Sequence, residues 1–161
     1  MKLNRVWTSN ILKILLVLFA MVIIFVGVYV LPIMAEEMSV IHPEIAYAKL
    51  PILLTCQLLL ILLLIGMGII MRLLIIFDRG LTFSTNFLKG VETLVTMCIA
   101  ASIIIIILFL YLRSFGGPGP LLSLIMIGTM FIVWIVGSVI ALIRAIVKQA
   151  IVYKNDYDLT V

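Results

Sequence analysis

Four long apolar runs, separated by short polar stretches, dominate the pattern of this chain. They cover approximately residues 14–34, 50–77, 91–112 and 121–147. Each run reaches the about 20 residues that an α-helix needs to cross a hydrocarbon layer about 30 Å thick. A segment in lipid must satisfy its own backbone N–H and C=O groups, so runs of this length predict helices. The pattern therefore predicts an all-α membrane protein, a single four-transmembrane-helix bundle over residues 1–161.

The start of the chain has a second interpretation. A basic stretch that precedes an apolar run is also typical of a secretory signal peptide. The 18 apolar residues before Pro32 exceed the roughly 7–15 of a signal peptide. We therefore expect a retained first span, with cleavage near Met34–Ala35 as the alternative.

The amino-acid composition excludes a water-soluble protein. Hydrophobic residues make up 66% of the 161 positions and charged residues 11%, against about 45–50% and about 25% in soluble domains. Too little polar surface remains to cover a water-soluble fold. Because the basic residues lie at the ends of the runs, the net charge of +4 indicates membrane orientation and not direct nucleic-acid binding.

The distribution of Lys and Arg predicts that orientation. With four spans, only Lys49 and Arg113 fall on one side of the membrane, and the other nine of the 11 basic residues fall on the opposite side. Basic residues accumulate on the cytoplasmic side. The sequence therefore predicts a multi-pass protein of the bacterial cytoplasmic (inner) membrane, with both termini in the cytoplasm.

The loop between the second and third runs combines turn signals with two aromatic residues. Asp78, Arg79 and Gly80 are typical of a helix end with glycine in a left-handed conformation. Ser84 is suited to cap a short helix that leads into the third span. Phe83 and Phe87 are four residues apart, which places them on one helix face. The loop is either a plain turn between spans or a docking surface for a cytoplasmic partner.

Glu92 is the acidic residue nearest to an apolar run. At the start of a helix, a carboxylate is stabilised by the helix dipole, and Arg72 is available either to pair with it or to extend to the headgroups. On the last span, Gly137, Ala141 and Ala145 repeat every four residues, a pattern typical of close helix packing, within the chain or in a homo-oligomer.

The spans contain few groups that carry chemistry. Their hydroxyl residues are expected to bond to other helices or to the carbonyl four residues earlier, and no acid, base or histidine lies near a span centre. The first loop holds three glutamates and the single histidine, His42, and we expect it to be a solvated loop. Nucleophile, metal and phosphate-loop motifs are absent. We therefore expect no enzyme activity, no cofactor and no metal site.

Several features together resemble a family of small bacterial membrane proteins, the domain of unknown function 2975. They are Pro51 at the start of the second span, the loop FDRGLTFSTNFLKGVETL, and the closing Asp158, Leu159, Thr160 and Val161. The resemblance extends from about residue 10 to the end, although KNDYD makes this tail less acidic than the family pattern. It implies no enzyme activity. Genes of this family often lie beside one for a very small helix-turn-helix regulator.

By that analogy, we expect a regulatory or interaction protein that engages a small cytoplasmic helix-turn-helix transcription regulator. The loop at 78–92 and the tail at 158–161 are its candidate docking residues. The alternative is a transport, small-channel or peptide-immunity protein that acts as an oligomer, since four helices this apolar enclose no polar pore.

Overall fold

The computed structural model describes residues 2–41, 43–80, 84–114 and 116–158, and all of its regular elements are helices. In chain order they are α1 (Lys2–Phe25), η1 (Val26–Val30), α2 (Leu31–Ile41), η2 (Pro43–Ala48), α3 (Lys49–Asp78), α4 (Thr85–Ser114) and α5 (Pro120–Asp158). Within the described residues, four stretches are long and apolar enough to cross a membrane: Ser9–Ile41, Ala46–Asp78, Thr85–Ser114 and Pro120–Tyr153. The prediction of an all-helical protein with four helices long and apolar enough to cross a membrane is confirmed.

Pro32 changes the geometry of the first span without ending it. Proline has no N–H, and its ring collides with the carbonyl four residues earlier in an α-helix. The chain responds just before Pro32 with a π-helical segment, η1, in which the Leu31 N–H bonds to the Val26 carbonyl five residues back. Such wider turns relieve a break in the regular hydrogen-bond ladder. The span therefore continues through η1 into α2.

The helices extend beyond the apolar runs at both membrane faces. The stretch expected to be a solvated loop after the first run is mostly helical, since α2 continues to Ile41 and η2 follows at Pro43. The short helix expected before the third span is the beginning of α4 itself. Polar residues suit a helix outside the membrane as well as inside it, so an apolar run marks the membrane layer and not the ends of the helix.

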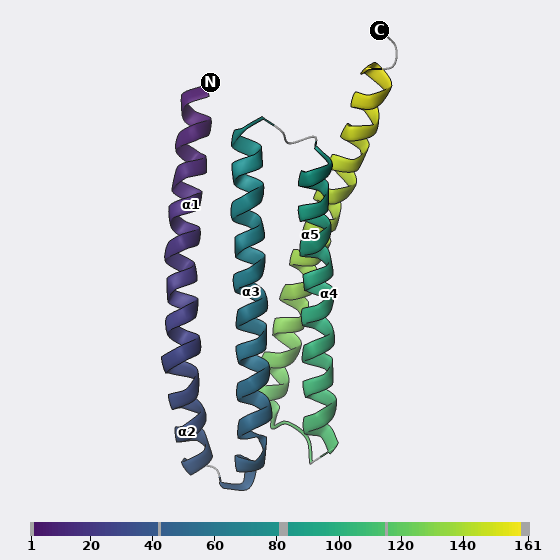
Figure 1. The fold of residues 1–161 in the computed structure, drawn as a ribbon. Helices are drawn as coiled ribbons and strands as arrows, with labels where there is room; N and C mark the ends of the chain where they lie inside the picture. The colour runs from purple at the N-terminus through teal and green to yellow at the C-terminus, as the bar shows by residue number, and fades with distance from the viewer. Residues whose placement is uncertain (1, 42, 81–83, 115, 159–161) are drawn as a thin grey trace.

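The helices pack mainly in the order α1, α3, α4, α5 (Figure 1). A buried cluster of Ala48, Ile105, Leu112 and Met126 joins η2, α4 and α5, and Ile52 and Leu59 of α3 pack against it. In Figure 1, α1 lies at one edge of the array beside α3. The four spans thus form a row in which each contacts the next, and η2, α3, α4 and α5 share one buried cluster.

Both ends of the chain lie at the same end of this array (Figure 1). We call this the terminal end: α1 begins, α3 ends, α4 begins and α5 ends there. The connections from α2 to α3 and from α4 to α5 lie at the opposite end. The final turns of α5 extend past the neighbouring helices at the terminal end.

Most large apolar side chains face outward. Leu124 and Trp134 on α5 are 69% and 53% exposed, and Leu54 on α3 is 61% exposed. An exposed apolar surface of this extent has no counterpart on soluble monomers. It is the surface expected of helices whose outer faces are solvated by lipid.

Candidate functional site

The turn between α3 and α4 at the terminal end is built as the sequence predicts. Gly80 has a φ of +75°, and its N–H donates to the Phe77 carbonyl at 3.0 Å, which ends α3. Ser84 caps α4, because its hydroxyl accepts from the Phe87 N–H at 3.3 Å. Both local predictions are confirmed, and Arg79 is the C-cap residue of α3.

Asp78 connects this turn to the first span. Its Oδ2 accepts a hydrogen bond from the Ser9 hydroxyl at 2.8 Å and pairs with the Lys13 ammonium group. Asp78 is the last residue of α3, where the helix dipole disfavours a negative charge. Lys13 offsets that cost, and Ser9 is itself buried, at 5% exposed. This three-residue contact fixes the beginning of α1 against the end of α3.

Glu92 connects the turn to the last span. Its Oε1 accepts from Arg144 Nη2 at 2.8 Å and from Arg144 Nε at 3.0 Å. The expected partner Arg72 is exposed and makes no ion pair among the described residues. Because α4 begins at Thr85, Glu92 lies two turns inside the helix, beyond the reach of the dipole. The stabilising partner is therefore Arg144, and the expected role of the helix dipole is wrong.

The aromatic pair and the tail of the predicted docking surface are described only in part. Phe87 is half-buried near the start of α4. Phe83 lies outside the described residues, as do Leu159, Thr160 and Val161. Asp158 is the last residue of α5. The segment predicted to be a tail is thus helical as far as the structure describes it.

The small residues on α5 divide into two groups. A Cβ atom added to Gly137 would lie 3.2 Å from Cys98 Cβ, so glycine there allows α4 and α5 to approach closely. Ala141 and Ala145 are exposed. Of the predicted stripe, Gly137 contributes to packing within the chain, whereas the two alanines face outward.

Hydroxyl groups within the spans are satisfied locally. Thr93, Thr96, Ser102 and Ser138 each donate to the carbonyl four residues earlier, at 2.8–3.1 Å. This confirms the expected back-bonds. No group of three or more metal-ligating side chains occurs among the residues that the structure describes.

The two interhelical contacts of Asp78 and Glu92 are what the sequence analysis missed. Both residues were singled out, but Ser9, Lys13 and Arg144 were not assigned to them. A usable signal was present, since the basic residues flanking the first and last runs lie at the same membrane depth as these acids. Such pairs are favourable where lipid lowers the dielectric constant. They make the terminal end a rim in which α1 is held to α3 and α4 to α5.

Comparison with known proteins gives a family and no function. No curated protein and no solved structure matches the chain. A family model described as a protein of unknown function (DUF2975) matches residues 33–161. That range includes Pro51, the α3–α4 turn and the end of the chain, and it begins later than the residue 10 expected from the sequence. The chain therefore belongs to the DUF2975 family of proteins of unknown function.

Proposed function

We propose that this protein is a regulatory or interaction protein of the bacterial cytoplasmic membrane, and that its terminal end binds a small cytoplasmic helix-turn-helix transcription regulator. The observation that carries the proposal is the length of α5. Its 39 residues correspond to about 58 Å at ~1.5 Å per residue, nearly twice the ~30 Å of the hydrocarbon layer.

The excess length lies at the terminal end. The last apolar run ends near Val147, and α5 continues to Asp158. Those eleven further residues extend the helix by about 16 Å. A rigid helix that projects from the membrane offers a face that a partner protein can bind, as in helix-in-groove recognition.

The rim gives this helix a fixed position relative to the α3–α4 turn. The Glu92–Arg144 contact joins α4 to α5, and the Ser84 cap fixes the start of α4. A partner that binds both the turn and α5 thus meets two surfaces at a defined separation, and little ordering of the protein is required on binding.

The cytoplasmic location of this end is part of the proposal. It is supported by the distribution of basic residues, nine on the side of the terminal end and two on the other side, because basic residues accumulate on the cytoplasmic side. Its test uses single cysteines in a chain with Cys56 and Cys98 replaced by serine. A membrane-impermeant maleimide should label Val40→Cys at the opposite end in intact cells and Tyr153→Cys only after lysis. The reverse pattern would refute the orientation.

The partnership is tested by affinity purification of the full chain from native membranes. We expect one small DNA-binding protein to be recovered, and to be lost from a variant that ends at Gln149. The control is Arg113→Gln, an exposed residue of the opposite end, which should retain the partner. Repeated recovery of no cytoplasmic protein, or full recovery by the shortened chain, would refute the proposal.

A further inference from the structure

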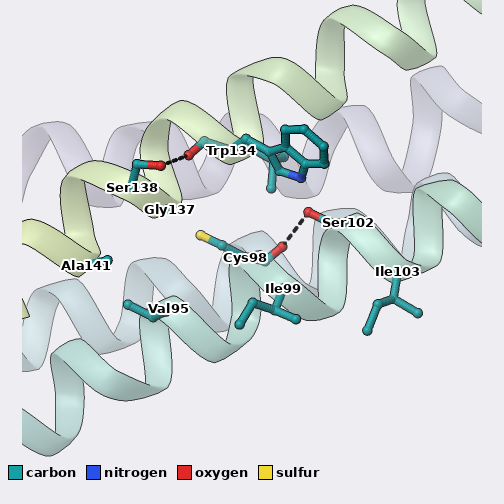
Figure 2. Close-up of a pocket in the computed structure, with 10 residues that line it drawn as sticks. Val95, Cys98, Ile99, Ser102, Ile103, Trp134, Gly137, Ser138 and Ala141 are labelled. Atoms are coloured by element: carbon teal, nitrogen blue, oxygen red, sulfur yellow. Dashed lines mark hydrogen bonds between the residues drawn. The ribbon is translucent and has the colours of Figure 1, made fainter.

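A groove between α4 and α5 opens on the outer face of the array (Figure 2). Its volume is about 390 Å³, and it is lined mainly by apolar groups of Val95, Ile99, Ile103, Trp134, Gly137 and Ala141. Gly137 and Cys98 lie between the helices, and Trp134 stands at one side. This volume falls within the range of sites that take small ligands, about 300–1,000 Å³.

The two serine hydroxyls in the groove donate to carbonyls of their own helices. The Ser102 hydroxyl donates to the Cys98 carbonyl at 2.9 Å, and the Ser138 hydroxyl donates to the Trp134 carbonyl at 2.8 Å (Figure 2). Among the described residues, no buried side-chain nitrogen or oxygen lacks a partner. Because the rest of the lining is mainly apolar, the groove favours a hydrocarbon chain.

Charged residues lie just beyond one end of the groove. Val95 is three residues after Glu92 on α4, and Ala141 is three residues before Arg144 on α5. One turn further out, Lys89 and Lys148 are both exposed. Along these two helix segments three cations thus accompany one carboxylate, which already accepts two hydrogen bonds from Arg144. The guanidinium has five N–H donors, so donors remain for a second anion.

The separation of Trp134 and Arg144 along α5 matches the length of one lipid acyl chain. Trp134 and Arg144 are ten residues apart on α5, or about 15 Å along the helix axis. This distance is half of the ~30 Å hydrocarbon layer. When Trp134 is near the middle of the membrane, Arg144 is therefore near its surface, and Lys148 reaches the headgroup layer.

We propose that the groove binds one acyl chain of an anionic phospholipid, whose phosphate lies beside Arg144 and Lys148. Apolar walls bind the chain, and the excess of positive charge selects an anionic headgroup over a zwitterionic one. This inference does not depend on a protein partner or on which side of the membrane the terminal end occupies.

The chain supplies its own probe for this site. Trp7 and Trp134 are its two tryptophans, so Trp7→Phe leaves the groove residue as the sole tryptophan, which is excited selectively over the tyrosines. The variant is reconstituted in phosphatidylcholine vesicles with rising fractions of phosphatidylglycerol, with brominated chains on one lipid at a time. Bromine quenches tryptophan on contact. We expect brominated phosphatidylglycerol to quench Trp134 with an apparent affinity about fivefold higher than that of brominated phosphatidylcholine. A factor of this size corresponds to the attraction of an anionic lipid by one basic residue.

Substitutions outside the groove separate charge selection from simple contact with lipid. Lys148→Gln removes an exposed cation. It should reduce the preference for phosphatidylglycerol, so that the two brominated lipids quench Trp134 almost equally. Glu92→Gln removes the neighbouring carboxylate while Arg144 stays, and it should increase the preference. Arg113→Gln, at the opposite end, is the matched control and should leave the preference unchanged.

Two results would overturn the proposal. Equal quenching by both brominated lipids would mean that Trp134 contacts ordinary bilayer lipid without selection. Quenching by neither would mean that the groove is covered by protein, for which a second copy of this chain is the first candidate. Cross-linking in the same vesicles identifies that second copy.

Discussion

Arg144 on α5 donates two hydrogen bonds to a single carboxylate oxygen of Glu92 on α4, at 2.8 and 3.0 Å. The residues are 52 positions apart, and the contact holds α5, just before its projecting turns, to the third turn of α4. Their side chains are 46% and 40% exposed, so water and headgroups screen part of the attraction. The pair is therefore a positional link of modest energy.

We expect a double-mutant cycle with Glu92→Gln and Arg144→Gln to give a coupling energy of about 0.5–1 kcal/mol, as for half-exposed pairs. The measurement is reversible unfolding in mixed detergent micelles. The exchanged pair Glu92→Arg with Arg144→Glu should recover most of the loss of either single reversal. A coupling energy of zero would show that the two charges act independently.

Asp78 should matter more than Glu92 for the position of α1. It binds both Lys13 and the buried Ser9 hydroxyl, and a buried donor without its acceptor costs about 1–3 kcal/mol. We expect Asp78→Ala to destabilise the protein by about this amount. Hydrogen exchange should also rise in the first turns of α1.

The control for this substitution is Glu37→Ala, an exposed acid on α2 at the opposite end. It should change neither the free energy of unfolding nor the exchange of α1. If Asp78→Ala increased exchange equally in all helices, Asp78 would be a general stability residue and not the anchor of α1.

Two glycines on α5 should respond differently to a larger side chain. A Cβ at Gly137 meets Cys98 Cβ at 3.2 Å, and that atom cannot move without its helix. At Gly128 no atom lies within 4 Å. We expect Gly137→Leu to destabilise the protein by about 1–3 kcal/mol, as for overpacked cores, and Gly128→Leu to have no such cost. Equal unfolding midpoints for both variants would contradict the close approach of α4 and α5.

The helical spans were predictable because lipid restricts the backbone conformations that can cross it. Backbone groups in hydrocarbon must bond within a helix, so the apolar runs predicted four helical spans. The ends of the helices were not predictable, because α5 continues from Val147 to Asp158 through polar residues and no apolar pattern marks its end. The π-helical segment before Pro32 was not expected either, since proline is compatible with a break, a kink or a bulge.

The candidate site was predictable only in its local part. Gly80 and Ser84 act through atoms a few residues away, and their roles follow from the turn chemistry of the sequence. The partners of Asp78 and Glu92 come from other helices, and a run of residues does not specify which helices are neighbours. The groove beside Trp134 depends on the same relation, because its lining comes from both α4 and α5.

Ser84 provides the most local test of the α3–α4 turn. Its hydroxyl accepts from the Phe87 N–H at 3.3 Å, and loss of such a cap costs about 0.5–2 kcal/mol. We expect Ser84→Ala to destabilise the protein by roughly 1 kcal/mol, whereas Ser84→Asp should be tolerated because its carboxylate replaces the acceptor. Ser138→Ala is the control, since that exposed hydroxyl donates only to its own helix. Unfolding midpoints measure all three. If Ser84→Ala matched Ser138→Ala, the start of α4 would be fixed by the Glu92–Arg144 link and not by its cap, and the turn would fray without loss of the fold.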